Sequence, residues 1–318
     1  MSSAQLIRCG QLAVRHSRDA EPAPLLSVVV PVAGQSVDFP QLLLVSSAVK
    51  ADGALELVVV VDGEAGPAIR KWTEEAQHEP TVVVLQSRGH DPGLARNCGL
   101  EAATGKYVCF LDADDVANMS AFLELARLQA GKLAPIGVLG FQVRDEIDAG
   151  QIVESWYPAS GTHCAWTDIQ RRAAVWRFVF DRDLLLQSGV RFPSGGYGED
   201  LLFLSRVFAQ FPEAEGLHLC GYTYRVHSTA QLTARRPPVE ATVSVLEDIR
   251  EQISLSSSSA ARLTLSSWYS RIALLQYVSL RTKVKLKRRL LASGLVWTAG
   301  QRWHSWLEGL FRPSGWRR

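Results

Sequence analysis

Acidic residues follow two apolar segments of the chain and could bind a cation or a nucleotide. Asp62 comes directly after the β-branched run 55–61, and Asp112, Asp114 and Asp115 follow the apolar run 107–111. Ligands of open α/β sheets bind at the carboxyl ends of the strands, and an Asp-x-Asp pair suits a hard divalent cation that also binds substrate phosphates. An isolated Asp-x-Asp is equally turn chemistry, so its position at a strand end is what favours a cation site.

Two further features could belong to the same site. Glu199 and Asp200 begin the amphipathic segment 199–210, where two acids are explained by favourable interaction with a helix dipole alone. His227 follows the apolar segment 217–226. A lone histidine is more often a hydrogen-bonded core residue than a ligand, so neither feature defines chemistry alone.

The elements that must position these residues alternate between strand and helix. The patterns predict strands at 25–32, 55–61, 81–85 and 107–111, separated by helices at 39–51, 68–77, 92–104 and 120–129. We expect Gly105 to cap the third helix and Ser120 the fourth. Such βαβ alternation is typical of a Rossmann-like, mostly parallel sheet with helices on both faces.

After residue 135 the pattern becomes mixed. We expect strands at 136–146 and 151–157 in a mixed edge region, a strand at 176–180, a helix at 182–188, the helix 199–210 and a strand at 217–226. Everything from Val239 onward has helical spacing, with a break at 256–259. The predicted organisation is a flexible extension (1–24), an α/β domain (25–235, divided at 135/136 where the pattern changes) and a C-terminal helical region (236–318).

Charge separates the C-terminal residues from the rest. The 318 residues carry a net charge of +2, but residues 281–318 contain ten Lys or Arg and one acid, whereas residues 1–280 contain 24 basic and 31 acidic residues. Five scattered cysteines without a C-x-x-C pair predict neither a disulfide framework nor a zinc site, and no secretory leader or membrane-spanning run is visible. A cytoplasmic protein is expected.

The ordered motifs of residues 25–230 resemble family 2 glycosyltransferases of the A-type nucleotide-sugar fold. They are Ser27-Val-Val-Val-Pro31, Val61-Asp-Gly-Glu64, Gly93-Leu-Ala-Arg-Asn97, Phe110-Leu-Asp-Ala-Asp-Asp115, Gly189-Val-Arg-Phe-Pro193 and Gly198-Glu-Asp200. Each motif alone is weak evidence for the family, whereas the full set in this order is specific to it. Many relatives have Asp-Asp-Gly-Ser where this chain has Val61-Asp-Gly-Glu64, so the base preference is less defined.

The resemblance implies that residues 25–235 form the catalytic domain, with a nucleotide-sugar-binding half (25–135) and an acceptor half (136–235). It also implies a role for each candidate residue. Pro31 and Asp62 would hold the uracil and ribose of a UDP-sugar, Asp112 would contact ribose or sugar hydroxyls, and Asp114, assisted by Asp112, would bind Mn²⁺ or Mg²⁺ at the diphosphate. Asp200 would be the general base of inverting transfer. Arg96 is either a solvated helix residue or a cation that faces the donor pocket, and His227 becomes a candidate for phosphate or metal contact.

The resemblance therefore implies a metal-assisted, inverting transferase that moves a sugar from a nucleotide sugar to a glycan or lipid-linked acceptor. The Gln-x-x-Arg-Trp signature of processive relatives is absent after Asp200, so one or a few additions are expected. Two alternatives remain: a nucleotidyltransferase, although residues 31–38 lack Lys and Arg, and a catalytically impaired sugar- or partner-binding module.

The basic region 281–318 has two interpretations. It contains the cluster 283–289 and a helical stripe of Val296, Ala299, Trp303, Trp306 and Leu310. Such a segment either packs on the catalytic domain as part of a helical bundle or lies on an anionic membrane surface, such as the inner face of the plasma membrane. No nucleic-acid recognition motif accompanies the basic residues, so nucleic acid is not an expected partner.

Overall fold

The computed structural model describes residues 23–76, 82–87, 91–147, 150–170, 172–195, 197–226 and 239–275. The predicted extension 1–24 lies almost entirely outside these residues, and His227 and the basic region 281–318 lie wholly outside them. Among the described residues, no helix is long and apolar enough to cross a membrane.

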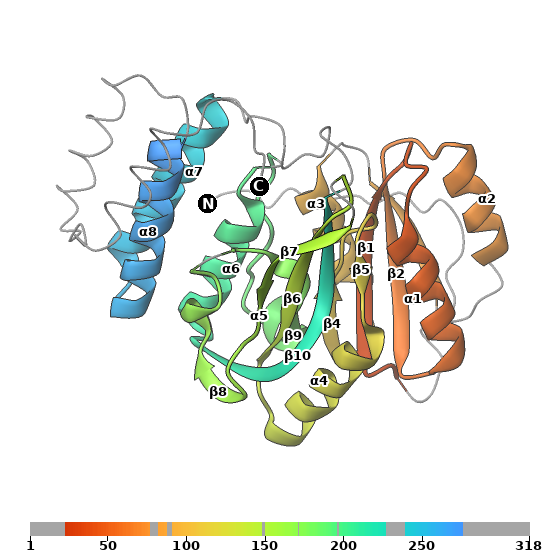
Figure 1. Ribbon diagram of the computed structural model, residues 1–318, viewed down its shortest axis with the longest axis horizontal. Coiled ribbons are helices and arrows are strands. Elements are labelled where there is room, and N and C mark those ends of the chain that lie inside the picture. Colours follow the sequence, from red (N-terminus) through yellow and green to blue (C-terminus); the bar gives the residue numbers. More distant parts are fainter. Residues whose placement is uncertain are drawn as a thin grey trace.

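The strands form one ten-stranded sheet of order β3-β2-β1-β4-β9-β6-β10-β5, with β7 paired to β6 and β8 to β10. The four strands of the first half are parallel to one another (Figure 1). The strands are β1 Leu26–Ala33, β2 Leu55–Asp62, β3 Val82–Ser87, β4 Tyr107–Phe110, β5 Val116–Ala117, β6 Ile136–Asp145, β7 Gln151–Trp156, β8 Gly161–Cys164, β9 Phe178–Asp181 and β10 Glu213–Val226.

Helices cover both faces of this sheet. They are α1 Pro40–Ala51, α2 Pro67–Ala76, α3 Pro92–Ala102, α4 Met119–Lys132, α5 Arg182–Gln187, α6 Glu199–Gln210, α7 Val239–Leu255 and α8 Ser259–Leu275, with 3₁₀ turns η1 Ala165–Thr167 and η2 Val175–Arg177. Alternate residues of β2 enter different cores. Val58 and Val60 belong to the core cluster that α3, α6, α7 and α8 also enter, whereas Leu57, Val59 and Val61 belong to the cluster of α1, α2 and α4. The prediction of a sheet with helices on both faces is confirmed.

The second half of the sheet corrects the expectation of a mixed edge region. Strand β6 lies between β9 and β10 in the interior of the sheet, because β10 returns parallel to β6 and covers its other side. Of the two strands expected at the edge, only β7 is an outer strand, and its first three residues are exposed. Trp176, expected in a strand, lies in the turn η2, and the short strands β5 and β8 were not predicted.

Two predicted caps are displaced. Asn118, and not Ser120, caps α4 by accepting a hydrogen bond from the Ala121 N–H, because the helix begins at Met119. Helix α3 ends with Ala103 as its C-cap. Gly105 is needed instead for close packing, since a Cβ there would lie 2.7 Å from the backbone nitrogen of Ser27.

The sequence predicted no disulfide framework, and one of the described cysteines is nevertheless bonded. Cys98 of α3 is disulfide-bonded, whereas Cys109, Cys164 and Cys220 are free thiols.

Candidate active site

The carboxyl ends of β1 and β2 hold the two residues predicted to bind the nucleotide. Pro31 lies beside Val60, and Ala33 is paired with Asp62 two residues further along. Asp62 is the last residue of β2 and is 9% exposed. Its Oδ1 accepts a hydrogen bond from the Ser87 hydroxyl, and its carbonyl accepts one from the Gly34 N–H at 2.9 Å. The Asp62 carboxylate is therefore fixed at the rim of the sheet.

The acidic turn 112–115 follows β4, and its last acid, Asp115, is buried and stabilises the turn. Asp115 is fully buried; its two oxygens accept hydrogen bonds from the Tyr222 hydroxyl and the Arg225 N–H, both at 2.7 Å. Burial raises the pKa of Asp115 to about 8, helped by the Asp112 charge. Tyr222 also accepts a hydrogen bond from the Asp112 N–H at 3.3 Å. Asp115 and β10 thus fix the backbone that carries Asp112 and Asp114.

Arg225 strengthens this support and was not singled out from the sequence. Its guanidinium donates to both carboxylate oxygens of Glu146 at 2.8 Å and to the Asp114 carbonyl, also at 2.8 Å. The Asp38 carboxylate, after β1, lies 3.5 Å away. Charge-assisted bidentate pairs of this type are among the stronger polar contacts. The available sequence signal was its position two residues before the candidate residue His227.

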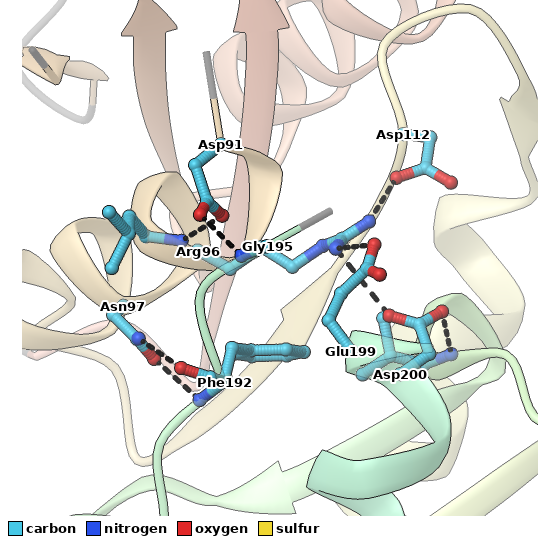
Figure 2. Close-up of polar contacts among 10 residues, drawn as sticks. Asp91, Arg96, Asn97, Asp112, Phe192, Gly195, Glu199 and Asp200 are labelled. Atoms are coloured by element: carbon cyan, nitrogen blue, oxygen red, sulfur yellow. Dashed lines mark hydrogen bonds and ion pairs between the residues drawn. The ribbon is translucent and has the colours of Figure 1, made fainter. Parts of the chain in front are cut away.

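Arg96 lies at the centre of the acidic residues (Figure 2). This α3 side chain is 5% exposed; its Nη2 lies 2.7 Å from Asp112, and its Nη1 lies 3.5 Å from both Glu199 and Asp200. Burial alone would lower the pKa of Arg96, but the charges of Asp200, Asp112 and Glu199 outweigh it and raise the pKa. Of the two sequence interpretations, the solvated helix residue is wrong.

Asp200 lies in the first turn of α6, facing Arg96 and η2 (Figure 2). Its Oδ2 accepts a hydrogen bond from the Val175 N–H at 3.0 Å, whereas no described residue donates a hydrogen bond to its Oδ1. Burial raises the pKa of Asp200 to about 7, and Arg96 opposes the rise. Its Oδ1 is the oxygen that lies 3.5 Å from Arg96 Nη1. A carboxylate with one oxygen oriented by a backbone N–H and the other held only by an ion pair could take a proton from a bound hydroxyl.

The donor set fits a cation that substrate phosphates complete. Asp112 and Asp114 are part-exposed carboxylates on one turn, and hard cations such as Mg²⁺ are held by one or two carboxylates plus phosphate oxygens and water. Within the described ranges, no group of three or more His, Cys, Asp and Glu side chains could hold a metal without a substrate. Asp112 would also have to share its carboxylate with Arg96.

The structure thus brings together the predicted residues Arg96, Asp112 and Asp200, joined by Glu199. Asp114 belongs to the same turn as Asp112. Pro31 lies on β1, which is next to β4 in the sheet, and Asp62 lies on β2, one strand further along. For His227, which lies outside the described residues, the role remains a prediction.

Comparison with known proteins finds a family to which part of the chain is similar. Residues 27–160 match the model for glycosyl transferase family 2. The uncharacterised glycosyltransferase YibD of Escherichia coli K12 is 24% identical over 230 residues, covering 64% of this chain and 62% of YibD. The succinoglycan biosynthesis protein ExoO of Rhizobium meliloti is 24% identical over 197 residues, covering 57% of this chain and 56% of ExoO. Residues 27–160 are thus similar to glycosyltransferase family 2, as the motifs predicted, and the chain spans less than two thirds of the length of these relatives.

Solved structures show the same fold. TarS residues 1–349 from S. aureus in complex with UDP-GlcNAc superpose with a TM-score of 0.63 at 16% identity, covering 90% of this chain and 79% of TarS. The TarS complex with UDP has a TM-score of 0.64 at 19% identity, covering 83% of this chain and 78% of TarS. The prediction of the A-type glycosyltransferase fold is confirmed.

Proposed function

We propose that this protein is an inverting glycosyltransferase that moves a sugar from a UDP-sugar to a hydroxyl of a glycan or lipid-linked saccharide. The observation that carries the proposal is Asp200. Its Oδ2 is oriented by the Val175 N–H, its Oδ1 accepts no hydrogen bond from the described residues, and its pKa is raised to about 7. This is the protonation behaviour that a general base needs near neutral pH.

In the proposed reaction Asp200 takes the proton of the acceptor hydroxyl as that oxygen attacks the anomeric carbon. The bond from this carbon to the diphosphate oxygen breaks on the opposite side, so the configuration inverts and UDP leaves. Arg96, in the donor pocket, supplies positive charge toward the diphosphate. When bound, Mn²⁺ or Mg²⁺ would neutralise charge on the leaving group, held by Asp114 and Asp112.

Asp62 and Pro31 are assigned to the nucleoside. A carboxylate accepts hydrogen bonds only, so the fixed Asp62 side chain suits a donor such as the uracil N–H. The UDP-GlcNAc and UDP complexes of TarS, which has the same fold, support a uridine nucleotide donor. The name of ExoO supports a role in polysaccharide biosynthesis. We place the protein in the cytoplasm, peripherally on the inner face of the plasma membrane.

A donor screen tests the proposed function. Release of the nucleoside diphosphate is measured from UDP-, GDP- and dTDP-sugars with Mn²⁺, and we expect UDP-sugars to give the highest turnover. Asp200→Asn is the matched control, because it removes the base but no nucleotide contact. It should lose transfer by about a thousandfold or more, a general base being worth roughly 10²–10⁴, while UDP affinity changes little.

Full activity of Asp200→Asn would remove the base assignment. If the wild-type chain binds UDP-sugars without turnover, it is instead a binding module. Diphosphate release from a nucleoside triphosphate and a sugar phosphate would identify a nucleotidyltransferase.

The metal assignment is tested by calorimetry of UDP binding. We expect Mn²⁺ to increase the affinity of the wild-type chain for UDP by about tenfold or more, equivalent to about 1.4 kcal/mol, and Asp114→Ala to abolish that increase. Glu124→Ala, on the exposed face of α4, is the control and should retain it. Equal wild-type affinity with and without Mn²⁺ would contradict the metal site.

A further inference from the structure

The loop before α6 is fixed to α3 by side chains that the proposed mechanism does not use. Asn97 is 2% exposed. Its Nδ2 donates to the Phe192 carbonyl and its Oδ1 accepts from the Phe192 N–H, both at 2.9 Å. Asp91, the N-cap of α3, accepts a hydrogen bond from the Gly195 N–H at 2.8 Å. Figure 2 shows both contacts on the side of α3 next to Arg96.

The fit between α3 and this loop is tight. A Cβ at Gly93 would lie 2.6 Å from the Pro193 carbonyl oxygen, so only glycine allows the observed approach. The loop ends at Gly198, which has φ of +70° and is the N-cap of α6. Asn97 therefore fixes the backbone six residues before this cap.

The ring of Phe192 connects this contact to the elements that carry the site. It stacks on Phe203 at 3.8 Å between ring centroids, and it meets Phe110 edge-on at 5.0 Å. The Arg96 guanidinium lies 5.4 Å from the same ring. Phe203 lies one helical turn after Asp200, and Phe110 lies two residues before Asp112. The Phe192 ring thus contacts both the helix that carries Asp200 and the strand that precedes Asp112.

We propose that Asn97 is a positioning residue for sugar transfer: by fixing Phe192, it sets the place of Asp200 relative to Arg96 and Asp112. The inference rests on the proposed function, because the position of Asp200 matters only if Asp200 is the base. The Asn97 amide hydrogen-bonds to both the N–H and the carbonyl of Phe192, so it fixes this residue in two directions. A misplacement of about 1 Å in a catalytic group can lower the rate about a hundredfold. No nucleotide contact is assigned to Asn97.

Asn97→Ala tests the proposal, with Gln129→Ala as its matched control. Gln129 is also a fully buried amide, and it donates to the Ala134 and Val179 carbonyls from α4, away from the acids. Both variants leave buried backbone groups unpaired and should lower the melting temperature. With the best donor of the screen, we expect Asn97→Ala to lower kcat at least tenfold with donor KM within twofold, and Gln129→Ala to retain the wild-type kcat.

Hydrogen exchange gives a second readout that needs no activity. We expect faster exchange in residues 190–203 of Asn97→Ala and not of Gln129→Ala. Unchanged exchange there would overturn the proposed contact, even if the wild-type chain transfers no sugar and the proposed function itself fails. Faster exchange with an unchanged kcat in an active protein would show that Asn97 only stabilises the fold, and would overturn its positioning role.

Discussion

At the scale of single residues, the site is defined by one buried cation among three acids. A buried charge requires close partners to offset the loss of hydration, and Arg96 has Asp112, Glu199 and Asp200 within 3.5 Å. In the sequence these four residues lie in three separate motifs. The positive charge of Arg96 next to Asp200 explains why the pKa of Asp200 rises only to about 7 despite burial.

The raised pKa of Asp200 predicts the pH dependence of transfer. Because the base must be ionised, kcat/KM, which reports the pKa of the free enzyme, should be nearly constant above pH 8, fall to half near pH 7 and drop about tenfold for each further unit of acidification. The measurement is kcat/KM against pH, with melting curves to show that the protein stays folded. A half-point near pH 4, the ordinary value for a carboxyl group, would contradict this assignment.

At the scale of elements, close approaches between loops at the strand ends shape the nucleotide side of the site. Gly34 follows β1, and its carbonyl accepts a hydrogen bond from the Gly66 N–H at 2.7 Å. A Cβ at Gly34 would lie 2.2 Å from the Glu64 carbonyl oxygen. The loops after β1 and β2 therefore pack against each other only with glycine at this position.

This packing predicts that Gly34→Ala weakens nucleotide binding. The added methyl group must push apart the two loops beside Asp62, so we expect the Kd for UDP to rise about tenfold, or about 1.4 kcal/mol. Gly53→Ala is the matched control, because nothing lies within 4 Å of a Cβ there. Equal UDP affinity in the two variants would show that these loops do not form the nucleotide site.

At the scale of the whole molecule, α7 and α8 continue the core on the α3 and α6 side of the sheet. Leu246 and Ile249 of α7 and Leu265 and Tyr269 of α8 are buried with Phe203 and Phe208 of α6 (Figure 1). The two helices that precede residues 276–318 in the chain, α7 and α8, are thus packed into the core of the molecule.

For the region 281–318 we propose binding to an anionic membrane surface, where a lipid-linked acceptor would be found. Each Lys or Arg near such a surface contributes about 1 kcal/mol. We expect the full chain to float with vesicles containing phosphatidylglycerol, and a variant with the basic residues of 283–289 changed to Gln to remain in the pellet fraction. The control replaces Arg127 and Arg70, exposed cations of α4 and α2, and should float. Equal flotation of the full chain and the 283–289 variant would exclude this role.

The sequence by itself determined the similarity to family 2 glycosyltransferases, the parallel half of the sheet and the identity of the acids at its strand ends. Continuous β-branched runs such as 55–61 specify strands buried on both faces, and short motifs in a fixed order show the similarity to the family. The tertiary structure decided the interior position of β6, the turn at Trp176, and the contacts of Arg225 and Asn97. These depend on contacts between residues far apart in the chain, as between Asn97 and Phe192, which no local pattern encodes.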